Sequence, residues 1–230
     1  MTDLEEKFGF EYPTFYKKLA EDGMLDWEFD VLQENRNQWK EEIAPKFSEN
    51  PPFLFSSLAK EIQLEGGFEL LSPVAVNELL EDPPWPLHYQ FIPFAKEIGP
   101  AYYGFYFQLK QGEDIPIAFL FPEMKDGEIV AKNLKDFIFR QLLQHAVHIP
   151  KSVDQDQYRE ELSKILESHK NYLSLEWYIK LHSIFQKPVT KYKHEAIKEG
   201  GFLIKIINFI LRNYLGMISW EEFNSLRVEE

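Results

Sequence analysis

The chain has 230 residues, of which 44% are hydrophobic and 27% are charged, a composition typical of a folded globular protein. It contains no cysteine, which excludes disulfides, thiolate metal sites and a cysteine nucleophile. The net charge is −13, and all of it lies in residues 1–150, which hold 26 acidic and 13 basic residues, whereas residues 151–230 hold 12 of each. This charge repels nucleic-acid phosphates and favours a basic protein partner, unless it only keeps the protein soluble.

The N-terminal segment MTDLEEKFGF lacks the basic and apolar stretches of a secretory signal, so we expect a cytoplasmic protein. The most apolar stretch, Phe202–Leu215, is too short to cross a bilayer and contains Lys205 and Arg212. We predict a buried helix there and no membrane partner.

Three helices are predicted before residue 65. Pro13 and Gly23 are a typical first residue and left-handed stop, so the first helix should cover Pro13–Asp22. A narrow apolar stripe predicts a second helix between Asp30 and Phe47, and a third should cover Phe53–Leu64.

A short strand, Phe68–Leu71, should follow, and Ser72 with Pro73 should then cap and open a helix that runs to about Leu80. The next residues, Glu81–Pro86, contain three prolines and cannot continue the helix. They predict a rigid acidic loop that carries one large aromatic residue, Trp85.

Two aromatic or apolar strands are predicted at Tyr102–Leu109 and Ile115–Phe121, and the second should be central in the sheet because it is almost entirely apolar. Lys125–Glu128 supplies a turn, and Ile129–Ala131 a short returning strand. Asn133 should then cap an amphipathic helix. A sheet covered by helices is an α+β fold, with mixed or antiparallel strands.

The C-terminal part is predicted to be helical. Apolar and aromatic residues recur at helical spacing from Tyr158 to Tyr172 and again from Leu175 to Phe185, and a further helical stretch should cover Lys193–Leu215. We therefore divide the chain into an α+β domain, residues 1–150, and a helical extension or subdomain, residues 151–230.

The order of these elements resembles the SUKH superfamily, which includes fungal cell-wall-assembly regulators and many bacterial immunity proteins. The resemblance covers roughly residues 4 to 147. It rests on four motifs: Phe8–Pro13 leading into the first helix, Leu71–Pro73, Ile92–Ala95 with Gly99, and Ile129–Phe137. It implies a SUKH-like α+β fold and a role in binding another protein.

The same resemblance implies a non-enzymatic immunity protein that masks the active site of a cognate toxin, possibly a nuclease. An acidic inhibitor of a basic nuclease is physically reasonable, because its carboxylates can occupy the positions of substrate phosphates. The alternatives are a regulatory scaffold of the same fold that binds a cellular partner, and a small-molecule sensor or enzyme with a polar pocket. The sequence does not define the oligomeric state.

The candidate interface residues are Glu81, Asp82, Trp85 and Glu97. Trp85 in a stiff acidic loop could anchor a partner, although packing against its own domain is the commoner role for such a residue. Neither a cofactor nor a metal site is expected: His145 and His148 have no third ligand at suitable spacing. The pairs Glu113–Asp114 and Glu123 with Asp126 could act as catalytic carboxylates, but acids in turns are usually solvated.

Overall fold

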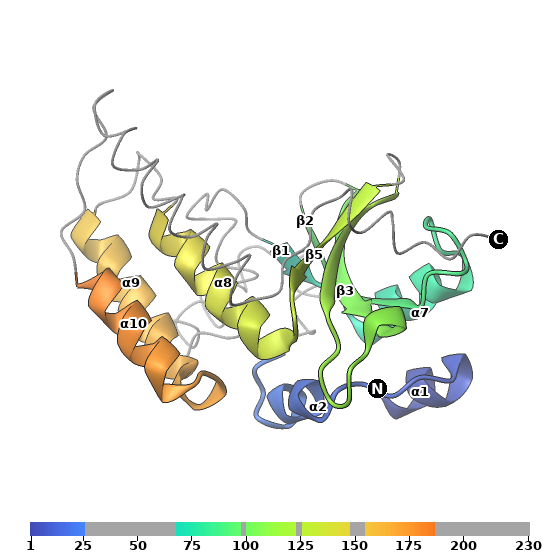
Figure 1. The fold of residues 1–230 in the computed structure, drawn as a ribbon, viewed down its shortest axis with the longest axis horizontal. Coiled ribbons are helices and arrows are strands. Elements are labelled where there is room, and N and C mark those ends of the chain that lie inside the picture. The colour runs from blue at the N-terminus through green and yellow to red at the C-terminus, as the bar shows by residue number, and fades with distance from the viewer. Residues whose placement is uncertain (26–67, 98–99, 123–125, 148–154, 187–230) are drawn as a thin grey trace, which may run out of the picture.

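In the computed structural model, helices flank a five-stranded antiparallel sheet, so the chain has the predicted α+β fold (Figure 1). The structure describes residues 1–25, 68–97, 100–122, 126–147 and 155–186. The helices are α1 (Thr2–Phe8), α2 (Thr14–Glu21), α7 (Pro73–Glu81), α8 (Leu134–Val147), α9 (Gln155–Ser168) and α10 (Leu175–Phe185), with the 3-10 helices η4 (Phe107–Leu109) and η6 (Lys170–Tyr172). The strands are β1 (Phe68–Leu70), β2 (Phe91–Glu97), β3 (Tyr102–Tyr106), β4 (Ile117–Phe121) and β5 (Asp126–Ala131).

Strand order in the sheet follows chain order, β1-β2-β3-β4-β5, and every pair is antiparallel. The register between β2 and β3 shifts between Pro93 and Ala95, because proline has no N–H to give to a ladder and is accommodated at a bulge. Opposite Pro93 lies Gly104, whose missing side chain leaves room for Phe91 and the Ile92 carbonyl. The two irregular residues therefore fit each other across the strand pair.

The predicted helix ends are confirmed. Gly23 has a φ of 71° and its N–H bonds to the Ala20 carbonyl just beyond α2. Ser72 Oγ accepts from the Ala75 N–H at 3.2 Å at the start of α7. Asn133 Oδ1 accepts from the Asp136 N–H at 3.0 Å at the start of α8. Each helix therefore begins or stops at the residue that the sequence pattern marks.

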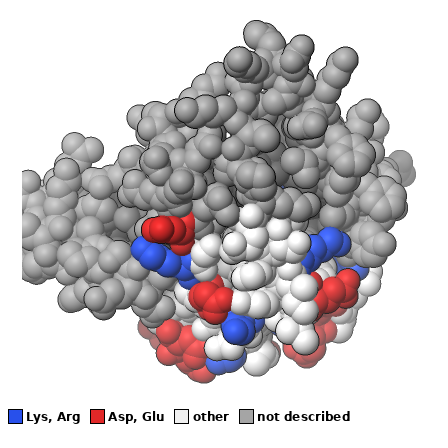
Figure 2. Space-filling view, turned by 90° about the vertical axis from the view of Figure 1, so that its left-hand side faces the viewer, with Lys and Arg blue, Asp and Glu red and all other residues white. Residues whose placement is uncertain are grey.

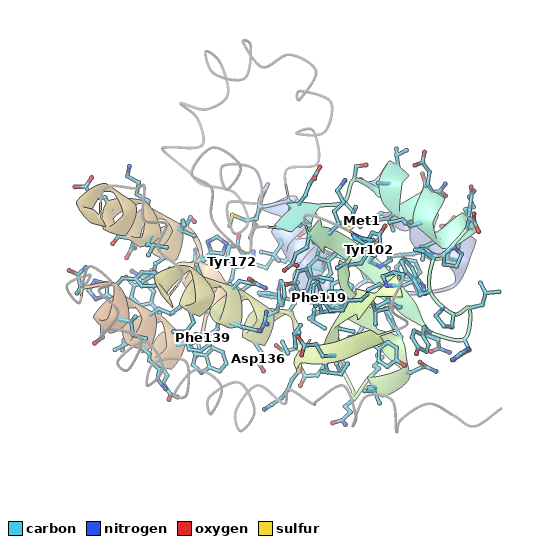
Figure 3. The ribbon with its side chains drawn as sticks, turned by 90° about the horizontal axis from the view of Figure 1, so that it is seen from above. Met1, Tyr102, Phe119, Asp136, Phe139 and Tyr172 are labelled. Carbon is cyan, nitrogen blue, oxygen red and sulfur yellow. The ribbon has the colours of Figure 1, made fainter. Side chains whose placement is uncertain are left out.

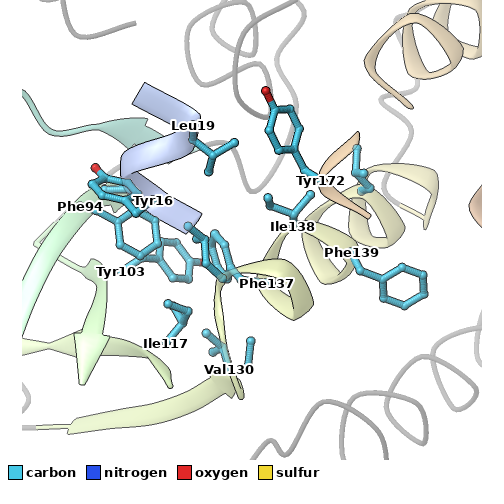
Figure 4. Close-up of a cluster of buried hydrophobic side chains, with 14 of the residues drawn as sticks. Tyr16, Leu19, Phe94, Tyr103, Ile117, Val130, Phe137, Ile138, Phe139 and Tyr172 are labelled. Atoms are coloured by element: carbon cyan, nitrogen blue, oxygen red, sulfur yellow. The ribbon is translucent and has the colours of Figure 1, made fainter. Parts of the chain in front are cut away.

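Successive strand residues point to opposite faces of the sheet, and each face is covered by a hydrophobic cluster. On one face α2 and α8 bring Tyr16 and Phe137 against Phe94 and Tyr103, as Figure 4 shows. On the other face a smaller cluster lies under the loop after α7; its buried members are Trp85, Tyr89, Phe91, Tyr106, Ala118, Leu120 and Ile129. The interior strand β4 contributes to both clusters, as its apolar sequence predicts.

The described part of the C-terminal extension packs onto the same core as the sheet. Leu162 and Ile165 of α9 and Leu181 of α10 belong to one cluster with Phe94 and Phe137. On α8, Phe139 points away from the sheet and packs on Trp177 of α10, with ring centroids 3.9 Å apart (Figures 3 and 4). Helices α9 and α10 thus share a hydrophobic core with the sheet and α8.

Some boundaries differ from the prediction. The strand that begins at Tyr102 ends at Tyr106, where η4 replaces the expected continuation to Leu109. Strand β5 begins at Asp126, inside the segment that was predicted to be a turn. Helix α1 and strand β2 had no counterpart in the prediction. The predicted helices at 30–47, 53–64 and 193–215 lie outside the described residues.

Candidate functional site

Glu81 and Asp82 lie at the C-terminal end of α7. The Glu81 carboxylate forms an ion pair with Lys7 of α1, and Lys7 Nζ also donates to Asn77 Oδ1 at 2.8 Å. The bond from Lys7 lowers the pKa of Glu81 below its ordinary value. Asp82 is exposed, and its carboxylate forms no ion pair or hydrogen bond with another described residue. Glu81 therefore joins two helices of its own chain, and Asp82 faces solvent.

Trp85 is buried, with 5% of its surface exposed. Its ring packs edge to face on Phe91 at 5.0 Å and on Tyr102 at 5.6 Å between centroids. A side chain in this position offers almost no surface to a partner. Of the two roles that the sequence left open for Trp85, the structure places it in the core of its own domain, so it is not an interface anchor.

Glu97 is half-buried at the end of β2 and accepts a hydrogen bond from Tyr103 Oη at 2.9 Å. Burial raises the pKa of Tyr103, which also bonds to the buried Arg140 of α8. Glu97 thus belongs to a polar network that links β2, β3 and α8. Its neighbours 98–99 lie outside the described residues.

A cavity of about 260 Å³ lies where three separate parts of the chain meet. The start of α2, the turn before β4 and the start of α8 form its wall; its lining residues are Pro13, Thr14, Phe15, Glu113, Asp114, Ile115, Asn133, Leu134 and Lys135. Ile115 and Leu134 are buried, and Phe15 is half-buried. The site therefore combines an apolar wall with polar groups that converge from distant parts of the sequence, which is the usual character of a binding pocket.

A tight turn holds the two carboxylates of this cavity. The Gln111 N–H bonds to the Asp114 carbonyl at 2.8 Å, and the Asp114 N–H bonds back to the Gln111 carbonyl at 3.0 Å. Gly112 in the turn has a φ of 61°, which glycine adopts without strain. Asp114 Oδ1 also accepts from Asn133 Nδ2 at 2.8 Å. The turn is therefore tied to the start of α8, and Glu113 and Asp114 stay exposed, as expected for acids in a turn.

Asp136, in the first turn of α8, has an unusual environment near this cavity. Its burial raises its pKa to about 6, and Asp114 adds to the rise, whereas Lys132 and Lys135 oppose it. Figure 3 shows Asp136 near the junction of α8 and the sheet. This residue was not among the sequence-predicted site residues, although a position three residues after the Asn133 cap is typical of a side chain that faces the start of a helix.

Lys135 is the cation that lines the cavity, and it is turned towards an aromatic ring. Its Nζ lies 5.1 Å from the centre of the Phe15 ring, a cation–π contact between α8 and α2. Among the described residues it forms no ion pair with Glu113 or Asp114. Glu113 and Asp114 thus have no cationic partner among the described residues, although Asp114 Oδ1 is bonded to Asn133.

The polar groups of the cavity define what it can bind. The described residues contain no group of three or more His, Cys, Asp or Glu side chains that could hold a metal ion. Glu123 and His148 lie outside the described residues, as do the side chains of Asp126 and His145. What the site offers is two exposed carboxylates, an amide, a hydroxyl and an apolar wall, a set that can orient a cationic group.

On the side of the molecule that carries α9 and α10, acidic and basic side chains lie next to one another among uncharged ones (Figure 2). One such pair is Lys170 with Glu167, 3.7 Å apart. This agrees with the even charge balance of residues 151–230. The acidic surplus lies in residues 1–150, which include the sheet and the cavity.

Comparisons of the chain with family models, with curated proteins and with solved structures found no match. Among the described helices, none combines the length and the apolar character that crossing a membrane requires.

Proposed function

We propose that the chain is a non-enzymatic protein-binding module that recognises a basic protein partner. In keeping with the resemblance to the SUKH superfamily, the partner is a bacterial toxin domain such as a nuclease, and binding masks its active site. The proteins would meet in the cytoplasm. One observation carries the proposal: Glu113 and Asp114 stand exposed on a rigid turn, while the nearest lining cation, Lys135, is held over Phe15.

The charge distribution supports the same proposal. The surplus of 13 negative charges lies in residues 1–150, so the field of this part attracts a basic surface and orients it towards the sheet domain. Asp82 adds another exposed carboxylate at the end of α7. Rim charges of this kind act chiefly on the association rate and on its salt dependence, which makes salt a useful variable in the test.

The test is affinity capture of the tagged full-length chain from its native host, at about 50 mM and about 200 mM salt, followed by co-expression with the captured protein. A 1:1 complex with a basic toxin domain that weakens with salt, together with loss of toxicity on co-expression, would support the proposal. A housekeeping partner would support the scaffold alternative instead. A complex that salt does not affect would contradict recognition by charge.

Variants of the chain sharpen this test. Glu113→Lys should slow association with the partner and reduce its salt dependence, because it reverses the charge of an exposed side chain that forms no ion pair or hydrogen bond with another described residue. Glu176→Lys, on the balanced α10 side, is the matched control and should have little effect. Equal effects of the two variants would show that net charge alone governs binding and would remove the turn from the interface.

A further inference from the structure

The cavity between α2, the 111–114 turn and α8 has the size of a site for one side chain. Its volume of about 260 Å³ lies below the roughly 300–1,000 Å³ of pockets that hold drug-sized ligands. It nevertheless exceeds by far the space that one water or one bare ion needs. A group of a few heavy atoms on an apolar stem matches this volume, whereas a nucleotide or a flavin does not.

The walls divide into an apolar part and a charged part. Ile115 and Leu134 are buried and present hydrocarbon, and Phe15 adds an aromatic surface. At the mouth, Glu113 and Asp114 supply carboxylate oxygens, and the hydroxyl of Thr14 adds a further acceptor. A ligand that fits both parts has an aliphatic stem and a cationic end.

The fixed geometry of the acidic end reduces the cost of binding. Both backbone hydrogen bonds between Gln111 and Asp114 hold the turn, and the Asn133 amide holds the Asp114 side chain. The Asn133 Oδ1 is already used by the Asp136 N–H, so the amide orientation is fixed by two bonds. Little conformational freedom remains to be lost at these groups when a ligand binds.

An anionic ligand fits poorly, even though α2 and α8 both begin at the cavity. The positive ends of these helices face Glu113, Asp114 and the first-turn Asp136, which already balance them. A phosphate or carboxylate would have to approach two carboxylates at the mouth. A cation meets the opposite situation, because the two carboxylates outnumber Lys135, whose Nζ lies over the Phe15 ring.

We propose that this cavity receives the guanidinium group of an arginine side chain from the basic partner, with the stem along Leu134 and the fork on Glu113 and Asp114. Arginine suits the site better than lysine, because its planar fork bonds two carboxylate oxygens at once and its charge is more weakly hydrated. This inference rests on the proposed function for the identity of the partner. The cavity itself can be tested without a partner.

The probe is Nα-acetyl-arginine N-methylamide, titrated into the isotopically labelled full-length chain while the backbone amide signals are followed by NMR. Binding in the millimolar range should shift the amides of the cavity wall, above all Thr14, Asp114 and Leu134. The matched control probe is Nα-acetyl-citrulline N-methylamide, which has nearly the same shape without the charge. It should bind at least about tenfold more weakly, since the charge-assisted bonds to carboxylate are lost.

Two variants should move the affinity for the arginine probe in opposite directions. Glu113→Gln should weaken it about fivefold, whereas Lys135→Met should strengthen it several-fold by removing a like charge and freeing the Phe15 ring. The control for charge is Glu78→Gln, an exposed residue on α7, which should leave the affinity unchanged. The side chains of Glu113 and Glu78 form no ion pair or hydrogen bond with another described residue, and folding can be checked from the undisturbed amide signals.

The inference is overturned if the citrulline probe binds as well as the arginine probe, if inorganic phosphate shifts the same amides more strongly, or if the shifts lie away from the cavity. These outcomes are separate from failure of the proposed function. Capture of a basic partner with no probe binding would support the proposed function and contradict the proposal that the cavity binds arginine. Probe binding at the cavity without any basic partner would contradict the proposed function and support a guanidinium-binding site.

Discussion

Tyr172 of η6 donates a hydrogen bond to Asp22, 150 positions earlier in the chain, with 2.6 Å between Oη and Oδ2. Asp22 also receives Lys18 Nζ at 2.7 Å, and these two bonds lower the pKa of Asp22 below its ordinary value, the lysine first. The Phe15 ring packs edge to face on Tyr172, 6.0 Å between centroids. One side chain thus fastens the C-terminal helices to both ends of α2.

Replacing Tyr172 with phenylalanine removes this bond and keeps the ring. A single hydrogen bond contributes about 1 kcal/mol in proteins, and in a chain of this length such a change lowers the melting temperature by about 2–4 °C. Tyr178→Phe is the matched control, because the Tyr178 hydroxyl also bonds a carboxylate, that of Glu167, but within the α9–α10 pair. Thermal unfolding of both variants checks the comparison; equal shifts would show that linkage to α2 adds nothing.

Because His169 is buried, we expect the folded chain to lose stability in mild acid. His169 is fully buried with Nδ1 2.8 Å from the Ile165 carbonyl oxygen, and burial lowers its pKa to about 4. The unfolded chain therefore binds this proton more tightly than the folded chain does, so the contribution is complete above pH 6.5 and is lost as pH falls towards 4. The loss amounts to about 3 kcal/mol over that interval.

Urea unfolding of the wild-type chain and of His169→Gln between pH 7 and pH 4 measures this effect. The variant should be less stable at pH 7, and its stability should fall less steeply towards pH 4. The exposed His182→Gln serves as the control and should follow the wild-type slope. A slope unchanged in His169→Gln would assign the acid sensitivity to other groups.

Gln141 on α8 is almost completely buried, and its Nε2 has no hydrogen-bond partner in the part of the chain that the structure describes. A buried amide in this state costs roughly 1–3 kcal/mol. Gln141→Met keeps the length of the side chain and removes the polar group, so we expect the free energy of unfolding to rise by about 1 kcal/mol. Denaturant unfolding, with the exposed Gln90→Met alongside, tests this; a loss of stability would mean that the amide is satisfied by water.

Gly104 in β3 should not tolerate a side chain. A Cβ at this position would overlap the Phe91 ring and lie 2.6 Å from the Ile92 carbonyl oxygen. Gly104→Ala should therefore lower the free energy of unfolding by about 2–3 kcal/mol, since overpacking in a core forces the backbone to shift. A second change, Phe91→Leu, should restore only part of the loss, because the Ile92 carbonyl remains. Full rescue would show that the ring alone sets the limit.

The sequence predicted the parts of the fold that depend on local chemistry. Helices α2, α7 and α8 begin or stop where Gly23, Ser72 and Asn133 predict, because capping involves residues only a few positions apart. Strand β2 was missed, because Pro93 argues against an interior strand and only its pairing with Gly104 resolves the conflict. Local patterns do not contain that information.

The candidate site was less predictable for the same reason. Glu113 and Asp114 were recognised as a carboxylate pair in a turn, but the cavity also needs Phe15 and Lys135, which lie far away in the sequence. Trp85 was a candidate interface residue, and its burial depends on ring contacts with Phe91 and Tyr102. In each case the deciding contact joins elements that only the folded chain brings together.

The sheet has the same order in space as in sequence, and this has a kinetic consequence. Each strand pairs with its immediate predecessor, and no described α-helix separates the strands from β2 to β5, so this part of the sheet can assemble by successive hairpin closures, each on a time scale of about 1–10 μs in isolation. The contact between Tyr172 and Asp22 instead closes a loop of 150 residues and has a larger entropic cost. We expect the hairpins to form first and the closure of α2 against η6 to be the late step that completes the core.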